Sequence, residues 1–181
     1  MSALRVRELY QLLAAGGVRC WIVGGWGIDA LLGRQTREHK DLDVFLVRSE
    51  HLRAWELLHS AGFSLDHRWE EDVDDADGGP EGTALPTAYV LTDGEGSQVD
   101  VHVLRDDLSP MWITDRALPA SALDASGTIE GLTVACMSAP MQRTAHTDYE
   151  LPEDHRRDLQ ALDEVDLRPA SGAGPLGRRR R

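Results

Sequence analysis

Residues 24–43 read GGWGIDALLGRQTREHKDLD, and this stretch decides the fold. Around it the sequence predicts a short strand over residues 19–23 and a helix over residues 26–32. A second strand, DLDVFLV, is predicted over residues 41–47. The stretch therefore describes a strand, a Gly-Gly turn, a helix and a strand that begins with two acidic residues.

Gly24 and Gly25 can serve a ligand at the turn between strand and helix. Glycines there let the backbone approach a bound group, and the helix N-terminus that follows presents amide groups to an anion. A turn with a purely structural role explains the two glycines better when they are taken alone. Because the next glycine is Gly33, the stretch matches neither GxGxxG nor GxxxxGK[ST], which disfavours a Rossmann dinucleotide site and a P-loop.

Asp41 and Asp43 alternate with an apolar residue, Leu42, at the start of the second strand. Alternate residues of a strand project to the same side, so both carboxylates face one way while Leu42 faces the core. Two neighbouring carboxylates repel each other unless a cation lies between them, and Mg²⁺ prefers oxygen ligands. The pair is a candidate metal clamp, and the alternative is a solvated strand end.

Asp100 and His102 alternate with valines in VDVHV, within a predicted strand over residues 98–104. Both side chains point away from the valines. Asp100 could complete a three-carboxylate metal site, and the alternative is the exposed face of an edge strand.

Length and composition favour one globular protein that does not bind nucleic acid. The 181 residues are 41% hydrophobic and 28% charged, which is ordinary for a soluble domain. The net charge of −12 disfavours nucleic acid, whose binding depends on Lys and Arg at phosphates. It suits metal ions and cationic small molecules, or it serves solubility alone. With no apolar run near the roughly 20 residues of a membrane helix and no secretory signal, we expect a cytoplasmic protein with no membrane partner.

The remaining chain predicts helices, hairpins and one acidic loop. Residues 66–86 combine acids, Gly and Pro, so we expect a mobile loop there. Ser49 and Ser138 are expected to cap helices. The other expected elements are a helix around residues 6–13, a helix to residue 59, a hairpin of residues 87–92 and 98–104, a β element over 128–134 turning at 130–131, a helix over 138–149 and a helix over 152–165.

The order of these elements indicates an α+β fold, a mixed or antiparallel sheet covered by helices, with further helices at the C-terminus. We expect a catalytic core over residues 1–110 and a C-terminal β and helical part over residues 111–168 that completes the site. Residues 169–181, PASGAGPLGRRRR, are expected to form a disordered basic tail.

Taken together, the Gly-Gly turn, the DxD and the later Asp100 form the pattern of the DNA polymerase β-like nucleotidyltransferase superfamily. Residues 24–43 closely resemble the lincosamide nucleotidyltransferases and, more loosely, the aminoglycoside 2″-adenylyltransferases. The resemblance continues in VDVHVL and in ACMSAPMQRTAHTDYELPEDHRRDL, and it covers roughly residues 21–162. It implies a nucleotidyltransferase fold, ATP as nucleotide donor, Mg²⁺, with two ions expected, and a homodimer.

The resemblance also assigns roles to single residues. It implies that Asp41, Asp43 and Asp100 are metal ligands and that Asp100 is the candidate catalytic base. Gly24, Gly25 and Trp26 then form the phosphate-side turn. Arg37, His39 and Lys40 offer cationic donors to the triphosphate, unless they are only exposed charges at the strand entry. The candidate substrate or phosphate contacts are His102, His146, Tyr149 and Arg157. For His146 and Tyr149 the alternative is a packing role. For Arg157, as for the neighbouring Asp154, Arg156 and Asp158, the alternative is a solvated helix face.

The function implied is transfer of AMP from ATP to a hydroxyl of a small sugar-bearing antibiotic, with release of pyrophosphate and hence antibiotic resistance. The acidic residues 66–86 favour a polycationic aminoglycoside as acceptor, whereas the motifs favour a lincosamide. Two other readings stay open: a toxin–antitoxin-type nucleotidyltransferase that modifies a protein or RNA, and a catalytically silent nucleotide-binding homologue. The intact set of three carboxylates argues against the silent homologue.

Overall fold

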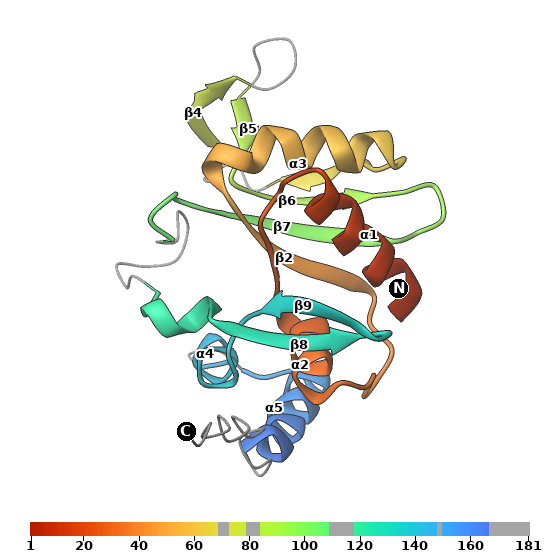
Figure 1. Cartoon of the computed structure of the whole chain (residues 1–181), viewed down its shortest axis with the longest axis vertical. Coiled ribbons are helices and arrows are strands. Elements are labelled where there is room, and N and C mark those ends of the chain that lie inside the picture. The colour runs from red at the N-terminus through yellow and green to blue at the C-terminus, as the bar shows by residue number, and fades with distance from the viewer. Residues whose placement is uncertain (69–72, 79–83, 109–117, 148–149, 167–181) are drawn as a thin grey trace, which may run out of the picture.

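A mixed seven-stranded sheet organises the protein, with strand order β3-β6-β7-β2-β1-β9-β8 (Figure 1). The computed structural model describes residues 1–68, 73–78, 84–108, 118–147 and 150–166. Within the sheet, β2 pairs in parallel with β7 and β1 in parallel with β9, while the other pairs are antiparallel. The strands are β1 (Cys20–Ile22), β2 (Asp41–Val47), β3 (Ser64–Arg68), β6 (Ala88–Thr92), β7 (Gln98–Leu104), β8 (Ala125–Ile129) and β9 (Leu132–Cys136).

Five α-helices and one short 3₁₀ helix surround the sheet in the described residues, and the predicted α+β class is confirmed. Apolar residues at helical spacing drive their packing. In α1 these are Val6, Leu9 and Leu13, all buried. The helices are α1 (Ala3–Ala15), α2 (Gly24–Leu32), α3 (Arg48–Ser60), η3 (Ala120–Leu123), α4 (Ala139–Ala145) and α5 (Glu153–Asp166).

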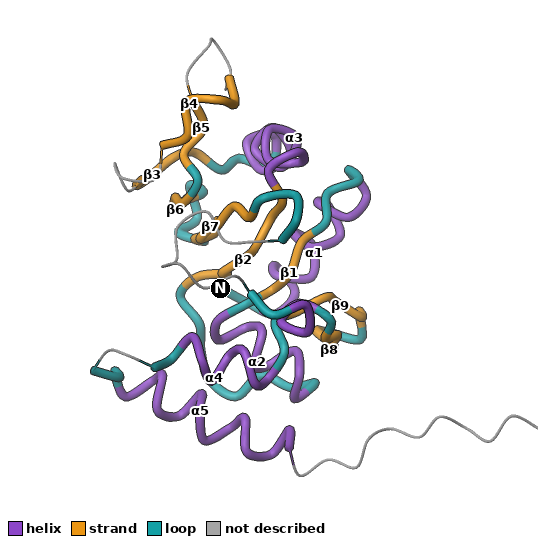
Figure 2. Tube along the Cα trace, turned by 90° about the vertical axis from the view of Figure 1, so that its left-hand side faces the viewer, coloured by secondary structure: helices purple, strands orange, loops and turns teal. Residues whose placement is uncertain are grey.

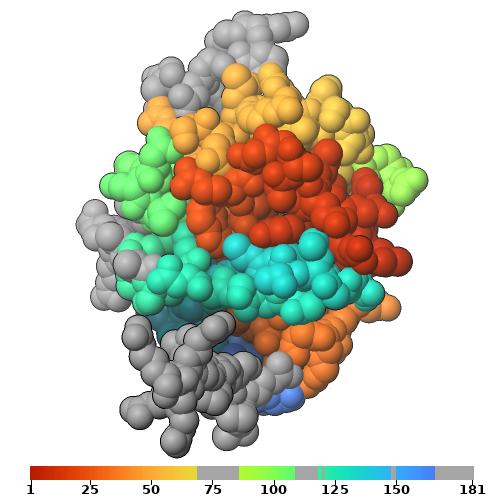
Figure 3. All heavy atoms as spheres, viewed as in Figure 1, coloured from red at the N-terminus to blue at the C-terminus, as the bar shows by residue number. Residues whose placement is uncertain are grey.

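The helices pack in two groups. Helices α1 and α3 share the main core with the sheet, and on one face of the molecule α1 lies beside the β8–β9 pair (Figure 3). Helix α2 packs on β8 and carries α5 on its other side, through a smaller core that includes Ile28, Leu32, Ala139 and Leu162. The C-terminal helix is thereby attached directly to the helix that begins with Gly24 and Gly25.

The prediction of a mobile loop over residues 66–86 is wrong for the described part of that stretch. Strand β3 continues to Arg68 and pairs with β6, and β4 (Val73–Gly78) pairs with β5 (Ala84–Pro86) in a separate two-stranded sheet. All five side chains of β3 are exposed, so no hydrophobic alternation marks this strand in the sequence. Backbone pairing with β6 holds this strand at the edge of the sheet. The β4–β5 pair and α5 lie at opposite ends of the molecule (Figure 2).

Three helix boundaries also differ from prediction. Helix α2 begins at Gly24 instead of residue 26, so the Gly-Gly turn is the first turn of this helix. Ser49 does not cap α3: the helix begins at Arg48 with Val47 as its N-cap, and the Ser49 N–H donates to Asp106 Oδ1 at 3.1 Å. Ser138 occupies the N-cap position of α4 without a capping bond from its side chain. Helix α4 ends at Ala145, earlier than predicted. Tyr149 and the tail over residues 169–181 lie outside the described residues.

Candidate active site

The three predicted carboxylates lie on two adjacent strands. In the parallel β2–β7 ladder, Asp43 is directly opposite Asp100 and Asp41 is opposite Gln98. Leu42, between the two acids of β2, is buried in the core as predicted. The alternation of strand residues therefore directs Asp41, Asp43 and Asp100 to one face of the sheet.

Burial and neighbouring negative charge raise the pKa values of Asp43 and Asp100. Burial, then the charges of Asp41 and Asp100, place the pKa of Asp43 well above its usual value. Burial, then the charge of Asp41, raises the pKa of Asp100 to about 6, and the positive charge of exposed Lys40 opposes this rise. Such a group of oxygen donors is stabilised by a cation. Within the described residues, no three His, Cys, Asp or Glu side chains are already grouped closely enough to hold a metal ion.

The Gly-Gly turn lies against these acids. The Val23 N–H donates to the Asp43 carbonyl at 3.0 Å, which ties the turn to β2. Gly24 has φ +59°, and a Cβ on it would lie 2.3 Å from Asp43 Oδ2. A Cβ on Gly25 would lie 2.5 Å from His39 Nδ1. Both positions therefore require glycine, because any side chain would occupy the space beside the carboxylate and the imidazole.

His39 and Trp26 are buried together beneath the turn. Their ring centroids are 4.6 Å apart, and each residue exposes at most 3% of its surface. His39 Nε2 bonds to a carboxylate oxygen of Asp29. The other oxygen of Asp29 accepts from the N–H and hydroxyl of Thr36, at 3.0 and 2.6 Å. Trp26 thus supports His39 by packing, and His39 presents its second ring nitrogen toward Gly25.

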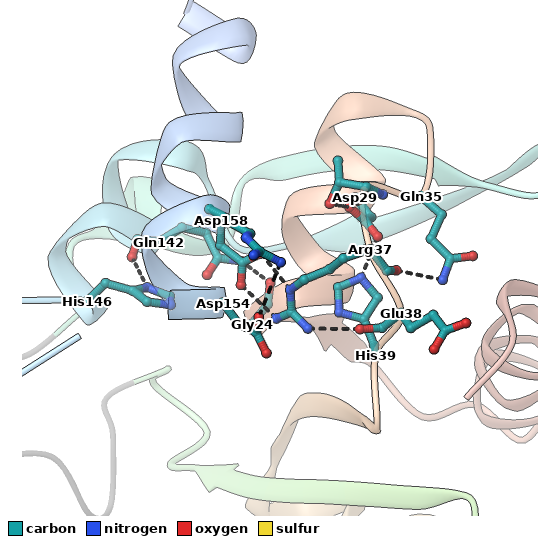
Figure 4. A network of polar contacts seen from close by, with 12 residues as sticks. Gly24, Asp29, Gln35, Arg37, Glu38, His39, Gln142, His146, Asp154 and Asp158 are labelled. Atoms are coloured by element: carbon teal, nitrogen blue, oxygen red, sulfur yellow. Dashed lines mark hydrogen bonds and ion pairs between the residues drawn. The ribbon is translucent and has the colours of Figure 1, made fainter. Parts of the chain in front are cut away.

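Arg37 is held by the C-terminal helix. Its Nε and Nη2 donate to the two carboxylate oxygens of Asp158 at 2.9 and 2.8 Å, and its Nη1 donates to the Glu38 carbonyl at 3.1 Å (Figure 4). Helix α4 reaches the same turn, where Gln142 Nε2 donates to the Gly24 carbonyl at 3.3 Å.

The four candidate substrate or phosphate contacts fall in different places. His102 lies on β7 two residues after Asp100, and burial lowers its pKa to about 4, so it is neutral at pH 7. His146 Nδ1 bonds to the Gln142 carbonyl, and its ring lies 4.9 Å from that of His155, so it packs between α4 and α5. Arg157 is 61% exposed and pairs with Glu153 on its own helix. Tyr149 lies outside the described residues.

Sequence reasoning missed Asp29 and Gln142 as members of this network. The signal for Asp29 was an acid inside the apolar helix segment GIDALL: a buried carboxylate in such a position needs partners. Gln142, which is 1% exposed, had no comparable signal, because its partner is a backbone carbonyl that only the fold brings near.

A family model described as aminoglycoside-2″-adenylyltransferase matches residues 5–162. The chain belongs to this family. Its similarity extends to a lincosamide resistance protein of Staphylococcus haemolyticus, which is 22% identical over 160 residues, covering 82% of this chain and 86% of that protein. The family resemblance predicted from the sequence motifs is therefore confirmed.

Solved structures of antibiotic nucleotidyltransferases share the fold of this family member. The lincomycin-bound crystal structure of the lincosamide antibiotic adenylyltransferase LnuA aligns with a TM-score of 0.74 at 21% identity, covering 91% of this chain and 98% of that one. The crystal structure of ANT(2″)-Ia in complex with adenylyl-2″-tobramycin aligns with a TM-score of 0.63 at 16% identity, covering 91% and 92%. The predicted nucleotidyltransferase fold is thus confirmed. Among the described helices, none has the length and apolar character needed to cross a bilayer.

Proposed function

We propose that this member of the family is a Mg²⁺-dependent adenylyltransferase that moves AMP from ATP to a hydroxyl of a sugar-bearing antibiotic. One observation carries the proposal: Asp43 and Asp100 are opposite each other across β2 and β7, with Asp41 on the same face. Burial first, and the charge of neighbouring carboxylates second, raise the pKa values of Asp43 and Asp100. The antibiotic class follows from family membership and from the relatives named above.

The donor set suits Mg²⁺ in charge and in ligand type. Asp41, Asp43 and Asp100 would hold the ions after rotation of their side chains, because adjacent ladder positions bring carboxylates within reach of one another. Bound Mg²⁺, with two ions expected, would neutralise charge on the phosphate oxygens during displacement. Gly24 and Gly25 leave room for the triphosphate at the α2 N-terminus, with Arg37 Nη2 and His39 Nδ1 beside Gly25. Lys40, whose charge acts on Asp100, would be a further cationic donor to the triphosphate.

In the proposed reaction, the acceptor hydroxyl oxygen bonds to the α-phosphorus of ATP. The bond from that phosphorus to the bridging oxygen breaks, and pyrophosphate leaves. Asp100 accepts the hydroxyl proton. Its pKa of about 6 leaves it mostly ionised at pH 7 and above while keeping it basic enough for this transfer.

Two acceptor classes follow from different features of the chain. The higher TM-score to the lincosamide enzyme favours a lincosamide. The acidic sequence of residues 66–86 favours a polycationic aminoglycoside. We further propose a cytoplasmic enzyme, where ATP is available, and a homodimer by family analogy alone; size-exclusion chromatography with light scattering measures its mass.

A pyrophosphate-release assay with ATP and Mg²⁺ tests the proposal across lincosamides, aminoglycosides and a no-acceptor control. Product should appear only with one antibiotic class and should disappear in Asp100→Asn. ATP binding without turnover on any acceptor would instead indicate a silent homologue. Adenylylation of a protein or RNA in place of the antibiotics would indicate a toxin–antitoxin-type enzyme. The net charge of −12 argues against an RNA substrate but not against a protein substrate.

A further inference from the structure

Arg37 lies between the C-terminal helix and the turn proposed to bind phosphate. Its bonds to Asp158 and to the Glu38 carbonyl use one N–H on each of Nε, Nη1 and Nη2. A guanidinium carries five N–H groups in one plane. These three bonds to described residues fix the plane of the guanidinium. They use only one of the two N–H groups of Nη1 and one of the two of Nη2.

The Nη2 atom lies on the side of Arg37 that faces Gly25. A Cβ on Gly25 would lie 2.8 Å from Arg37 Nη2 and 2.5 Å from His39 Nδ1. The space that glycine leaves open at this point therefore adjoins the Arg37 guanidinium, the His39 imidazole and the α2 N-terminus. Such a combination suits a phosphate oxygen, because guanidinium N–H groups bind phosphate in the same planar geometry as carboxylate.

Asp158 is itself held rigidly. Only 2% of its side chain is exposed. Its helix is fixed to α2 by Leu162, which is fully buried in one core with Ile28 and Leu32. A buried carboxylate on a packed helix cannot follow Arg37 to a new position, so the guanidinium takes the position that α5 dictates.

We infer that Asp158 is a positioning residue for nucleotide binding: from helix α5 it holds the Arg37 guanidinium beside Gly25, where the remaining N–H groups bind the triphosphate of the donor. This inference rests on the proposed function, and it makes the C-terminal helix part of the nucleotide site. Asp158 touches no substrate itself and acts only through Arg37.

The test measures ATP affinity directly, by isothermal titration calorimetry with Mg²⁺ and without acceptor, and steady-state constants in parallel. Asp158→Asn should weaken ATP binding about tenfold, the scale of one mispositioned charge-assisted hydrogen bond. KM for ATP should rise equally, while KM for the antibiotic should stay within about twofold. The matched control is Asp163→Asn on the same helix, whose ion pair with Arg143 at 3.0 Å is exposed; its ATP affinity should equal that of the wild type.

A double-mutant cycle shows whether Asp158 acts through Arg37. Because both changes remove the same contact, Asp158→Asn should weaken ATP binding little further in an Arg37→Gln background. Additive losses would overturn the inference. Unchanged or tighter ATP binding by the single Asp158→Asn variant would also overturn it, since tighter binding means that Asp158 competes with phosphate for Arg37.

Two controls distinguish failure of this inference from misfolding of the variant and from failure of the proposed function. Circular dichroism and thermal melting show whether each variant is folded. If Asp158→Asn does not fold, Asp158→Glu keeps the charge but shifts the carboxylate by one methylene, and wild-type ATP affinity in that variant would contradict the inference. A wild-type protein that binds no ATP refutes the proposed function instead.

Discussion

Asp43 of β2 and Asp100 of β7 are direct partners in a parallel ladder, although they lie 57 positions apart in the sequence. The pairing places two acids side by side at a point where most sheets pair residues of neutral or opposite charge. Burial raises both pKa values, and neighbouring charges add to it: Asp41 and Asp100 at Asp43, and Asp41 at Asp100. The arrangement costs stability in the free protein, and a bound cation would recover it.

Asp100→Asn is expected to remove turnover much more than ATP binding. The amide keeps the shape of the side chain but cannot accept a proton, which costs about 10²–10⁴ in rate, with a further loss from weaker metal binding. Steady-state kinetics and calorimetric ATP titration measure the two effects. Asp124→Asn, at an exposed position after η3, is the control. Turnover near the wild-type value in Asp100→Asn would show that Asp100 is neither base nor ligand.

The same substitution should stabilise the metal-free protein at pH 7.5. A carboxyl whose folded pKa is raised adds stability that is complete below the unfolded pKa near 3.8 and is lost as the pH rises through the folded value of about 6. Asp100→Asn removes this loss, so its melting temperature in EDTA should exceed that of the wild type by about 2–4 °C. The difference should shrink at pH 5. A lower melting temperature at pH 7.5 would count against repulsion among the carboxylates.

Mg²⁺ should stabilise the wild-type protein at pH 7.5, and EDTA should reverse the effect. A ligand that binds only the folded state adds about 2.7 kcal/mol when its concentration is a hundred times its Kd. Asp43→Asn removes one of the three carboxylates and should strongly reduce the shift. Thermal melting with and without Mg²⁺ measures this, and equal shifts in both proteins would exclude Asp43 as a ligand.

Gly25→Ala should weaken ATP binding by about tenfold or more, because the added methyl group would collide with His39 and Arg37. Gly94→Ala is the matched control, since no atom lies within 4 Å of its built Cβ and its φ is not positive. Calorimetric titration of ATP compares the two variants. If both bind ATP like the wild type, the space beside Gly25 does not hold the triphosphate.

The acidic residues 70–77 are expected to set acceptor preference rather than ATP affinity. Replacing the Glu and Asp residues of this stretch by their amides should raise KM for a cationic aminoglycoside at low salt and change KM for ATP little. Each exposed ion pair contributes only about 0–1 kcal/mol, and salt screens it. The effect should therefore fade at high salt. A changed KM for ATP with a constant KM for the antibiotic would reverse the assignment.

The sequence predicted the catalytic strands closely because their signals are local. Leu42 between two acids, and the valines on both sides of Asp100, mark which side chains face the core. The helix that ends at Gly33 was equally clear, since that glycine adopts the left-handed conformation that stops the helix. Strand β3 was missed, because its exposed side chains carry no alternation and its stability comes from pairing with β6.

The sequence by itself determined the family, the class of fold and the residues at the ladder position where Asp43 meets Asp100, because period-two alternation and the Gly-Gly turn act over a few residues. Only the tertiary structure decided which partner each charged side chain takes. Asp158 resembled a solvated residue of a charged helix, yet packing of Leu162 against α2 buries it and brings it to Arg37. Such pairings depend on burial at contacts between elements more than a hundred residues apart, and no local pattern records them.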